Sequence, residues 1–156
     1  GEPLPKELLD KMLAAKNYQA ALFILRQLEF GLFDFRLHAE FRPDQGAKIL
    51  ETLAEIKKLV AVVPSPSWGR FPHAFSHIFA GGYAAGYYGY KWAEVLAADA
   101  FSLFKEKGIF NPEVAEAFRR EILSKGGHEH PMTLYKRFRG QEPTIDALLI
   151  RNGIKK

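Results

Sequence analysis

The 156-residue sequence contains no cysteine. This absence excludes disulfide bonds, thiolate zinc ligands and a thiol nucleophile. No stretch reaches the roughly 18 uncharged apolar residues that a membrane-spanning helix needs. The opening GEPLPKELLDKML has neither the basic start nor the apolar stretch of a signal peptide. We therefore expect a protein without disulfide bonds or a membrane anchor, for which the cytoplasm is a fitting compartment.

A block of basic residues is also missing, although the formal net charge is +4. The 22 lysines and arginines alternate with 18 acidic residues. Such interleaving is typical of solvated helix faces. Because nucleic-acid binding needs a basic patch or stripe, we expect no nucleic-acid partner.

Motifs for an activated nucleophile are absent: there is no GxSxG, no P-loop and no Cys/His pair. His73 and His77 have the spacing of two zinc ligands on one helical turn, but Ala74 stands where the general-base glutamate belongs. Pro72 and the surrounding loop argue against a regular helix there. We therefore expect no zinc ligand in this chain.

The remaining histidines have structural interpretations. His128 and His130 follow a double glycine, which predicts an exposed turn. His38 lies beside Asp34 and Phe41 in a long apolar segment, which favours a hydrogen-bonded histidine in or next to the core.

The apolar residues recur at helical spacing, and no segment shows convincing β-alternation. We expect one compact all-α fold, an irregular multi-helix domain, in which the helix over 17–41 is central and largely buried. Pro43 ends that helix, and Asp44 is expected to cap the next one. The predicted helices cover residues 5–15, 17–41, the segment from the Asp44 cap to about 61, 83–107, 111–125, 131–138 and 143–152.

Residues 63–82 hold three prolines and three glycines and show no sustained period. They predict a long loop, and a loop of this length in a compact domain is usually functional.

Tyr83, Tyr87 and Tyr90 follow this loop at spacings that place them within about 60° of one helix face, whereas Tyr88 points elsewhere. Three phenols on one face can donate hydrogen bonds towards a groove, with His77 close by. An aromatic stripe buried in the core would have the same spacing.

Four glycines in the same stretch bear on this choice: Gly81, Gly82, Gly86 and Gly89. Each weakens a helix by roughly 1 kcal/mol relative to alanine, which a core helix has no reason to accept. The glycines therefore favour a hinged substrate loop.

Four segments resemble the C-terminal region of the thimet oligopeptidase family of zinc peptidases. They are KNYQAALFILRQLEFGLFDFRLH, VAVVPSPSWGRFPHAFSHIFAGG, FSHIFAGGYAAGYYGYKWAEVLAADAFSLF and RFRGQEPTIDALLIRNGI. Together they extend the resemblance over nearly the whole chain. Gln141 and His128 depart from the family pattern, in which arginine and serine are usual.

The resemblance implies a mostly helical, neurolysin-like channel peptidase. Its zinc is held by the two histidines of an HExxH helix and a downstream glutamate, with the HExxH glutamate as general base. None of these is present here, so residues 1–156 are expected to be a single C-terminal helical fragment, inactive alone. The start at Gly1 instead of methionine also suggests a piece of a longer chain. Expected partners are short peptides and the upstream catalytic half, and exposed apolar surface would favour self-association.

The resemblance also assigns roles within the loop. The substrate-binding histidine of the family matches His77, and its loop tyrosines match Tyr83, Tyr87 and Tyr90. With Gly81 and Gly82 these residues form the expected substrate-binding set. Tyr83 and Tyr90 are the expected catalytic donors, which stabilise the oxyanion of the scissile carbonyl. The alternative is a non-catalytic helical domain whose aromatic loop binds a peptide or protein.

Overall fold

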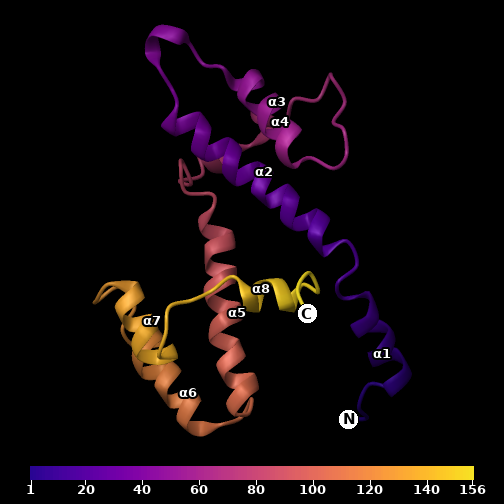
Figure 1. Ribbon diagram of the computed structural model, residues 1–156, viewed down its shortest axis with the longest axis vertical. Coiled ribbons are helices and arrows are strands. Elements are labelled where there is room, and N and C mark those ends of the chain that lie inside the picture. The colour runs from indigo at the N-terminus through magenta and orange to yellow at the C-terminus, as the bar shows by residue number, and fades with distance from the viewer. The chain divides into compact units, whose positions relative to one another are not determined.

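The computed structural model describes residues 1–156, which divide into two compact units. Unit 1 comprises residues 1–91 and unit 2 residues 92–156, and each is described by itself. The regular elements are all helices, apart from an isolated β-bridge between Arg42 and Gly46 (Figure 1). This confirms the all-α prediction. No helix has the length and apolar character that crossing a membrane would require.

The helices of unit 1 form where apolar residues recur at helical spacing. Their order is α1 (Lys6–Ala15), α2 (Ala20–Ala39), the 3₁₀ turn η1 (Pro43–Gln45), α3 (Ile49–Val60), α4 (Phe71–Ala74) and the 3₁₀ turn η2 (Ser76–Ile78). Helix α5 (Gly89–Lys107) begins in unit 1 and continues into unit 2.

The core of unit 1 lies where α2 and α3 pack side by side and the segment after α3 returns to them (Figure 1). Fully burying one large apolar side chain stabilises a fold by about 1.5–3 kcal/mol, so this cluster anchors the unit. Its buried members are Phe33, Leu53, Ile56, Phe75, Ile78 and Tyr87.

The prediction that α2 is largely buried is wrong. Phe23, Leu28 and Phe35 are exposed, by 60%, 42% and 50%. Only a narrow face that includes Phe33 and Asp34 is fully covered. The apolar stripe of α2 is wider than the surface that the rest of unit 1 can cover. The width of the stripe in the sequence therefore predicted more burial of α2 than the structure shows.

The capping prediction for the next helix is also wrong. Asp44 lies in η1, and the residue before α3 is Lys48, which makes no side-chain cap. Gly46, with φ of 70°, turns the chain between the two elements. Asp44 instead faces the Arg42 guanidinium, with 3.4 Å between Nε and Oδ1.

Two further boundaries differ from the sequence prediction. The segment 63–82 is not a continuous loop, because α4 and η2 form within it. Pro72 is compatible with α4 because it lies in the first turn, where no backbone donor is needed. The helix expected from Tyr83 begins at Gly89, and residues 84–88 form turns.

Unit 2 continues from α5 through α6 (Pro112–Phe118), the π-helical turn η3 (Arg119–Leu123), α7 (Pro131–Arg139) and α8 (Asp146–Arg151). Gly108 ends α5 with φ of 110°, as predicted. The Asn111 side chain caps α6 by accepting from the backbone N–H groups of Glu113 at 2.9 Å and Val114 at 3.2 Å. The glycine stop and the asparagine cap each depend on a few adjacent residues, so both helix ends can be predicted from the sequence.

The helix predicted over 111–125 contains an unexpected π turn. The backbone N–H of Ser124 donates to the carbonyl of Arg119, five residues back, at 2.8 Å. An α-helix makes this bond to the fourth residue back, so the turn holds one residue more than an α-helical turn.

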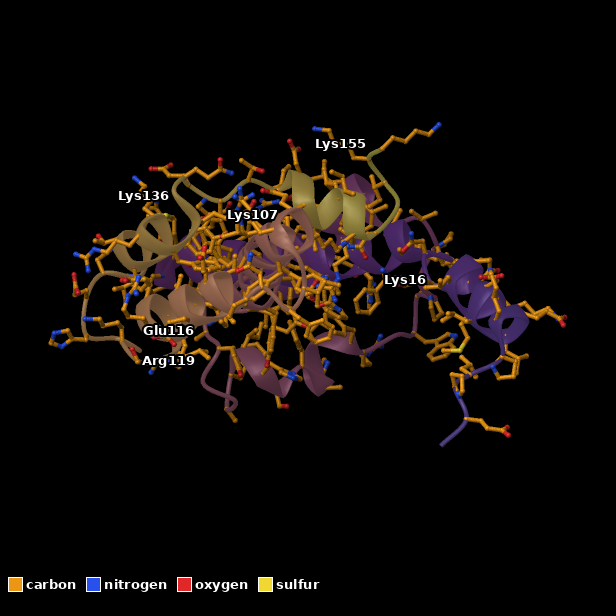
Figure 2. The ribbon with its side chains drawn as sticks, turned by 90° about the horizontal axis from the view of Figure 1, so that it is seen from below. Lys16, Lys107, Glu116, Arg119, Lys136 and Lys155 are labelled. Carbon is orange, nitrogen blue, oxygen red and sulfur yellow. The ribbon has the colours of Figure 1, made fainter.

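Most charged residues lie on the outside of the helices, as the interleaved charges predicted, whereas Glu29, Asp34 and Asp99 are buried. Figure 2 shows the side chains of Lys136 and Lys155 extending away from the ribbon. Lys136 pairs with Glu142, and Lys155 pairs with Asp146 at 2.8 Å. Exposed pairs of this kind contribute about 0.2–1 kcal/mol each, so they serve solubility more than stability.

Candidate functional site

Four predicted site residues come together in unit 1, and we call them the tyrosine cluster: His77, Tyr83, Tyr87 and Tyr90. The Tyr83 and Tyr90 rings stack, with centroids 5.0 Å apart. Tyr87 meets Tyr90 edge to face at 5.2 Å. The ring centroid of His77 lies 6.1 Å from that of Tyr83 and 5.9 Å from that of Tyr87. The rings are therefore neighbours although residues 84–88 are not helical.

A tight turn, not a helix face, brings the cluster together. The Gly81 N–H donates to the Ser76 carbonyl at 2.8 Å, and the Tyr83 N–H donates to the His77 carbonyl at 2.9 Å. A Cβ on Gly81 would lie 2.7 Å from the His77 Cα, which is too close for any side chain. Gly82 has φ of 78°, in the left-handed region. Both glycines are thus required by the turn, and their contact with substrate stays a prediction.

Tyr87 belongs to the core of unit 1. Its residue is 9% exposed, and its hydroxyl donates to Oε1 of Gln27 at 3.1 Å. Burial raises the pKa of Tyr87, although the bond to Gln27 acts in the opposite direction. The structure therefore gives this tyrosine a packing role, and its predicted contact with substrate stays untested.

Tyr83 and Tyr90 are more accessible, at 38% and 42% exposed. Hydrogen bonding with Tyr83, followed by burial, raises the pKa of Tyr90. The phenol of Tyr90 therefore stays protonated at neutral pH. Two hydroxyls carry two protons, so even when one hydroxyl donates to the other, the pair keeps one donor for a ligand.

Asp34 is a site residue that the sequence analysis missed. Its carboxylate is fully buried and accepts the backbone N–H groups of Ala85 and Tyr87, both at 2.9 Å. Asp34 therefore fixes the turn that carries the tyrosines. One signal in the sequence could have identified Asp34: it is an acidic residue within the apolar part of a predicted helix. A buried aspartate is rarely left without hydrogen-bond donors, so its position indicates a structural or functional partner.

The prediction of a hydrogen-bonded His38 is confirmed. Its Nδ1 lies 2.8 Å from the backbone carbonyl oxygen of Asp34 and 3.0 Å from Oδ1 of the same residue. A proton on Nδ1 serves both oxygens, so His38 steadies the carboxylate that holds the turn.

The residues of the structure do not fit a zinc site. No group of three or more histidine, cysteine, aspartate or glutamate side chains could hold a metal ion. His73 lies in α4 and His77 in η2, so the two do not share a regular helical turn. A zinc ion needs three or four such ligands around one point.

Residues 1–154 match the sequence profile of Peptidase family M3. The chain belongs to this family. It is 83% identical over 155 residues to "Oligopeptidase A" of Escherichia coli (strain K12), a match that covers 99% of this chain and 23% of that protein. "Oligopeptidase A" of Haemophilus influenzae is 63% identical, with 99% and 23% covered. "Saccharolysin" of Saccharomyces cerevisiae is 33% identical, with 99% and 22% covered.

The family match extends over both units of the chain. It confirms the resemblance stated from the four sequence segments. The chain spans about a quarter of the length of these M3 relatives, at 23% of the Escherichia coli protein.

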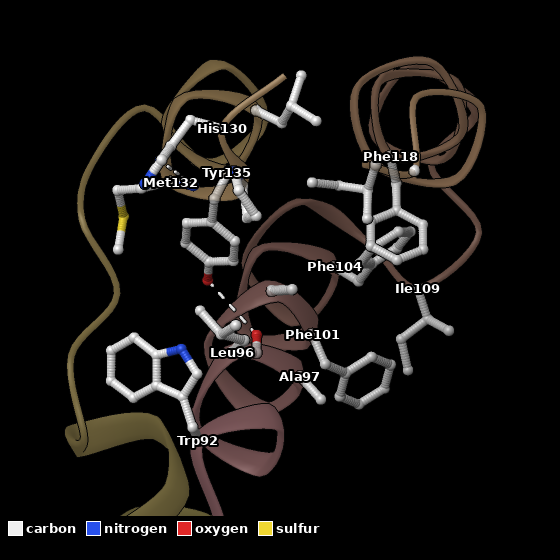
Figure 3. Close-up of a pocket in the computed structure, with 15 residues that line it drawn as sticks. Trp92, Leu96, Ala97, Phe101, Phe104, Ile109, Phe118, His130, Met132 and Tyr135 are labelled. Carbon is white, nitrogen blue, oxygen red and sulfur yellow. Dashed lines mark hydrogen bonds between the residues drawn. The ribbon is translucent and has the colours of Figure 1, made fainter. Parts of the chain in front are cut away.

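Unit 2 of this M3 chain carries an apolar groove of about 820 Å³ (Figure 3). Figure 3 shows the rings of Trp92, Phe101, Phe104 and Phe118 around it. Tyr135 also lines the groove, but its hydroxyl donates to the buried Asp99 carboxylate at 2.5 Å. The groove therefore offers hydrophobic contact and few free polar groups.

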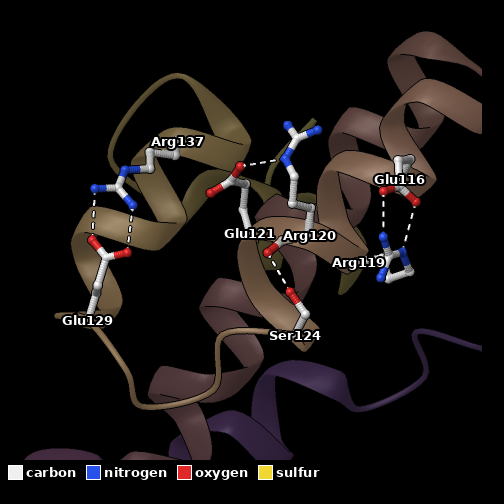
Figure 4. A network of polar contacts seen from close by, with 7 residues as sticks. All are labelled: Glu116, Arg119, Arg120, Glu121, Ser124, Glu129 and Arg137. Atoms are coloured by element: carbon white, nitrogen blue, oxygen red, sulfur yellow. Dashed lines mark hydrogen bonds and ion pairs between the residues drawn. The ribbon is translucent and has the colours of Figure 1, made fainter.

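The double-glycine segment beside α7 is an exposed turn in this M3 chain, as predicted. His128 and His130 are exposed, and Nδ1 of His130 accepts the Met132 N–H at 3.2 Å. Figure 4 shows the paired contacts of Arg137 with Glu129, which are both 2.8 Å long. His130 thus serves the start of α7, and His128 lies in the exposed turn before it.

Proposed function

We propose that residues 1–156 are the C-terminal, substrate-binding part of a zinc-dependent endopeptidase that hydrolyses short peptides in the cytoplasm. Membership of Peptidase family M3 supports the peptidase class. The 23% share of the Escherichia coli relative supports a part within a longer chain. The observation that carries the proposal is the exposed Tyr83–Tyr90 phenol pair, whose members flank a turn that a buried carboxylate holds.

The proposed chemistry of this part is charge stabilisation. Attack on a peptide carbonyl places negative charge on its oxygen, and a positioned O–H that donates to that oxygen lowers the barrier. Tyr90 is the donor, and Tyr83, whose ring stacks on it, positions it. His77 and the backbone around Gly81 and Gly82 bind the peptide.

The zinc ligands and the general base are proposed to lie in an upstream catalytic half of the same polypeptide. Residues 1–156 hold no group of ligands that fits the metal. The isolated chain is therefore expected to be inactive. After dialysis, purified residues 1–156 should retain no stoichiometric zinc. Retention that is lost in His73→Ala would contradict this assignment.

A second candidate function is a non-catalytic helical domain that binds a peptide or a protein. Exposed side chains such as Phe110, Trp68 and Leu59, at 95%, 76% and 74%, favour a partner surface of some kind. In the peptidase proposal the partner is the upstream half, and without it the chain should self-associate. Sedimentation as a clean monomer at high concentration, without binding of a hydrophobic dye, would favour an autonomous domain.

The decisive experiment compares two tyrosine variants in the full-length peptidase. Tyr90→Phe keeps the ring and deletes the donor, so kcat should fall about 10²-fold while KM changes little. Tyr88→Phe is the matched control, because Tyr88 is 54% exposed and its ring packs edge-on against Phe35 at 6.0 Å. Steady-state kinetics on a quenched fluorescent peptide give both constants. Equal, small effects would overturn the proposal.

A further inference from the structure

We propose that Asp34 is the positioning residue of the site: it fixes the turn over residues 83–87 and thereby the phenol pair of Tyr83 and Tyr90. This inference rests on the proposed function. Asp34 makes no hydrogen bond to either phenol, and it acts on them through the backbone between them.

The geometry uses both oxygens of the carboxylate. Oδ1 accepts the N–H of Ala85 and Oδ2 accepts the N–H of Tyr87, each at 2.9 Å. The two amides are separated by one residue, so they converge on one carboxylate from the same turn. An asparagine has only one acceptor oxygen, and its NH₂ group would face the second N–H. The site therefore needs an aspartate specifically.

The turn is strained at the residue that Asp34 holds. Ala85 has φ of 54°, a conformation that residues with a Cβ rarely adopt. Such strain persists only where the surroundings over-determine it. Because Ala85 lies between Tyr83 and Tyr87, release of its N–H would let Tyr83 move relative to Tyr90.

Helix α2 supports the turn at more than one point. Gly31, on the same face one turn before Asp34, is buried, and a Cβ there would lie 3.7 Å from the Tyr88 Cα. One turn after Asp34, His38 places Nδ1 3.0 Å from Oδ1. The Asp34 carboxylate is therefore fixed by a contact within its own helix as well as by its bonds to the turn.

The test uses the full-length peptidase with Asp34→Asn in the wild-type and Tyr90→Phe backgrounds. Hydrogen exchange of the segment 79–91 should become about tenfold faster, because a bond that closes the turn is lost. In the wild-type background kcat should fall about tenfold with KM within about twofold. In the Tyr90→Phe background the further loss should be less than about threefold, since the donor is already gone.

Each outcome has a defined meaning. Unchanged exchange in the segment 79–91 overturns the inference, because Asp34 would not hold the turn. An equal kcat loss in both backgrounds also overturns it, because Asp34 would then act apart from Tyr90. Normal kinetics for Tyr90→Phe alone would refute the proposed function, and exchange would still decide whether Asp34 anchors the turn.

Two further variants separate positioning from general stability. Asp44→Asn changes an exposed aspartate of the same unit, whose side chain is 66% accessible, and should leave exchange and kinetics unchanged. Asp34→Asn combined with Ala85→Gly removes the strain that Asp34 opposes, so it should recover about half of the lost activity and improve a poorly folding single variant. No recovery would contradict the positioning role.

Discussion

Each unit holds a tyrosine beside other polar groups, and the two tyrosines have opposite uses. In unit 2, Tyr135 is 6% exposed, and its hydroxyl donates to the Asp99 carboxylate. In unit 1, Tyr90 is 42% exposed, and its ring stacks on the ring of another phenol, Tyr83, at 5.0 Å. A carboxylate consumes the single proton of a phenol, whereas a phenol partner leaves one proton over. The partner therefore decides whether a tyrosine serves stability or a ligand.

The buried aspartates follow the same division. Asp99 is 3% exposed and faces side chains, with Tyr135 as donor and the Nε of Arg139 at 3.5 Å. Asp34 is fully buried and accepts two backbone amides. One carboxylate thus immobilises a phenol, while the other immobilises a turn and leaves its phenols accessible.

The largest expected effect on stability comes from removing the Tyr135 hydroxyl. Tyr135→Phe leaves the buried Asp99 short of a donor, which should destabilise unit 2 by about 2–3 kcal/mol. The kcat per folded molecule should not change. Urea unfolding followed by hydrogen exchange of the α5 and α7 peptides measures the loss of stability in unit 2. Kinetics normalised to the concentration of active sites measure the kcat. A kcat loss like that of Tyr90→Phe would remove the distinction between the two phenols.

The next effect concerns the glycine turn. Gly81→Ala places a Cβ against the His77 backbone at 2.7 Å, so the turn must move, at a cost of about 2 kcal/mol. We expect kcat/KM to fall about tenfold in peptide-hydrolysis assays, because the cluster is displaced. Gly89→Ala is the control, since a Cβ there meets no atom within 4 Å. Similar losses from both variants would mean that flexibility, and not close approach, explains the glycines.

Tyr87→Phe should have a smaller effect that resembles the Tyr135 case. The variant loses the bond to Gln27, which contributes about 1 kcal/mol, and keeps the packing of the ring. Thermal unfolding of the full-length protein should detect this loss, while kcat changes less than about threefold. A kcat effect as large as that of Tyr90→Phe would place Tyr87 among the donors.

The smallest effect is a shift in pH dependence. Hydrogen bonding with Tyr83 raises the pKa of Tyr90, so Tyr83→Phe should lower it. A phenol donates only while it is protonated, and an unperturbed tyrosine titrates near pH ~10. The alkaline limb of kcat/KM, which reports the pKa values of the free enzyme, should therefore move to lower pH in Tyr83→Phe and stay in place in Tyr88→Phe. A limb that does not move would show that Tyr90 does not control it.

The sequence predicted most helices, because apolar spacing and caps such as Asn111 and Gly108 are local signals. Prediction from the sequence failed where contacts between distant parts of the chain determine the local structure. The tyrosines were grouped correctly on the assumption of a helix, but a turn brings them together. That turn depends on a bond between Ala85 and Asp34, which are 51 residues apart. The periodicity of residues 79–95 could not reveal this bond. Nor could the sequence of α2 show that its apolar stripe is wider than the surface that covers it, because that surface belongs to other segments.

The π turn of η3 makes the direction of the following chain depend on the number of residues. The Ser124 N–H reaches back five residues to Arg119, and its Oγ donates to the Arg120 carbonyl at 2.7 Å (Figure 4). Each residue of an α-helix advances the chain by about 100° around the axis. Deleting one residue within Arg119–Leu123 would restore α-helical bonding and keep the exit towards Gly126 in register. Inserting a residue into a neighbouring α-helical turn would rotate everything after it by that angle, so within residues 112–123 η3 is the place where the helix can lose a residue without turning the chain that follows.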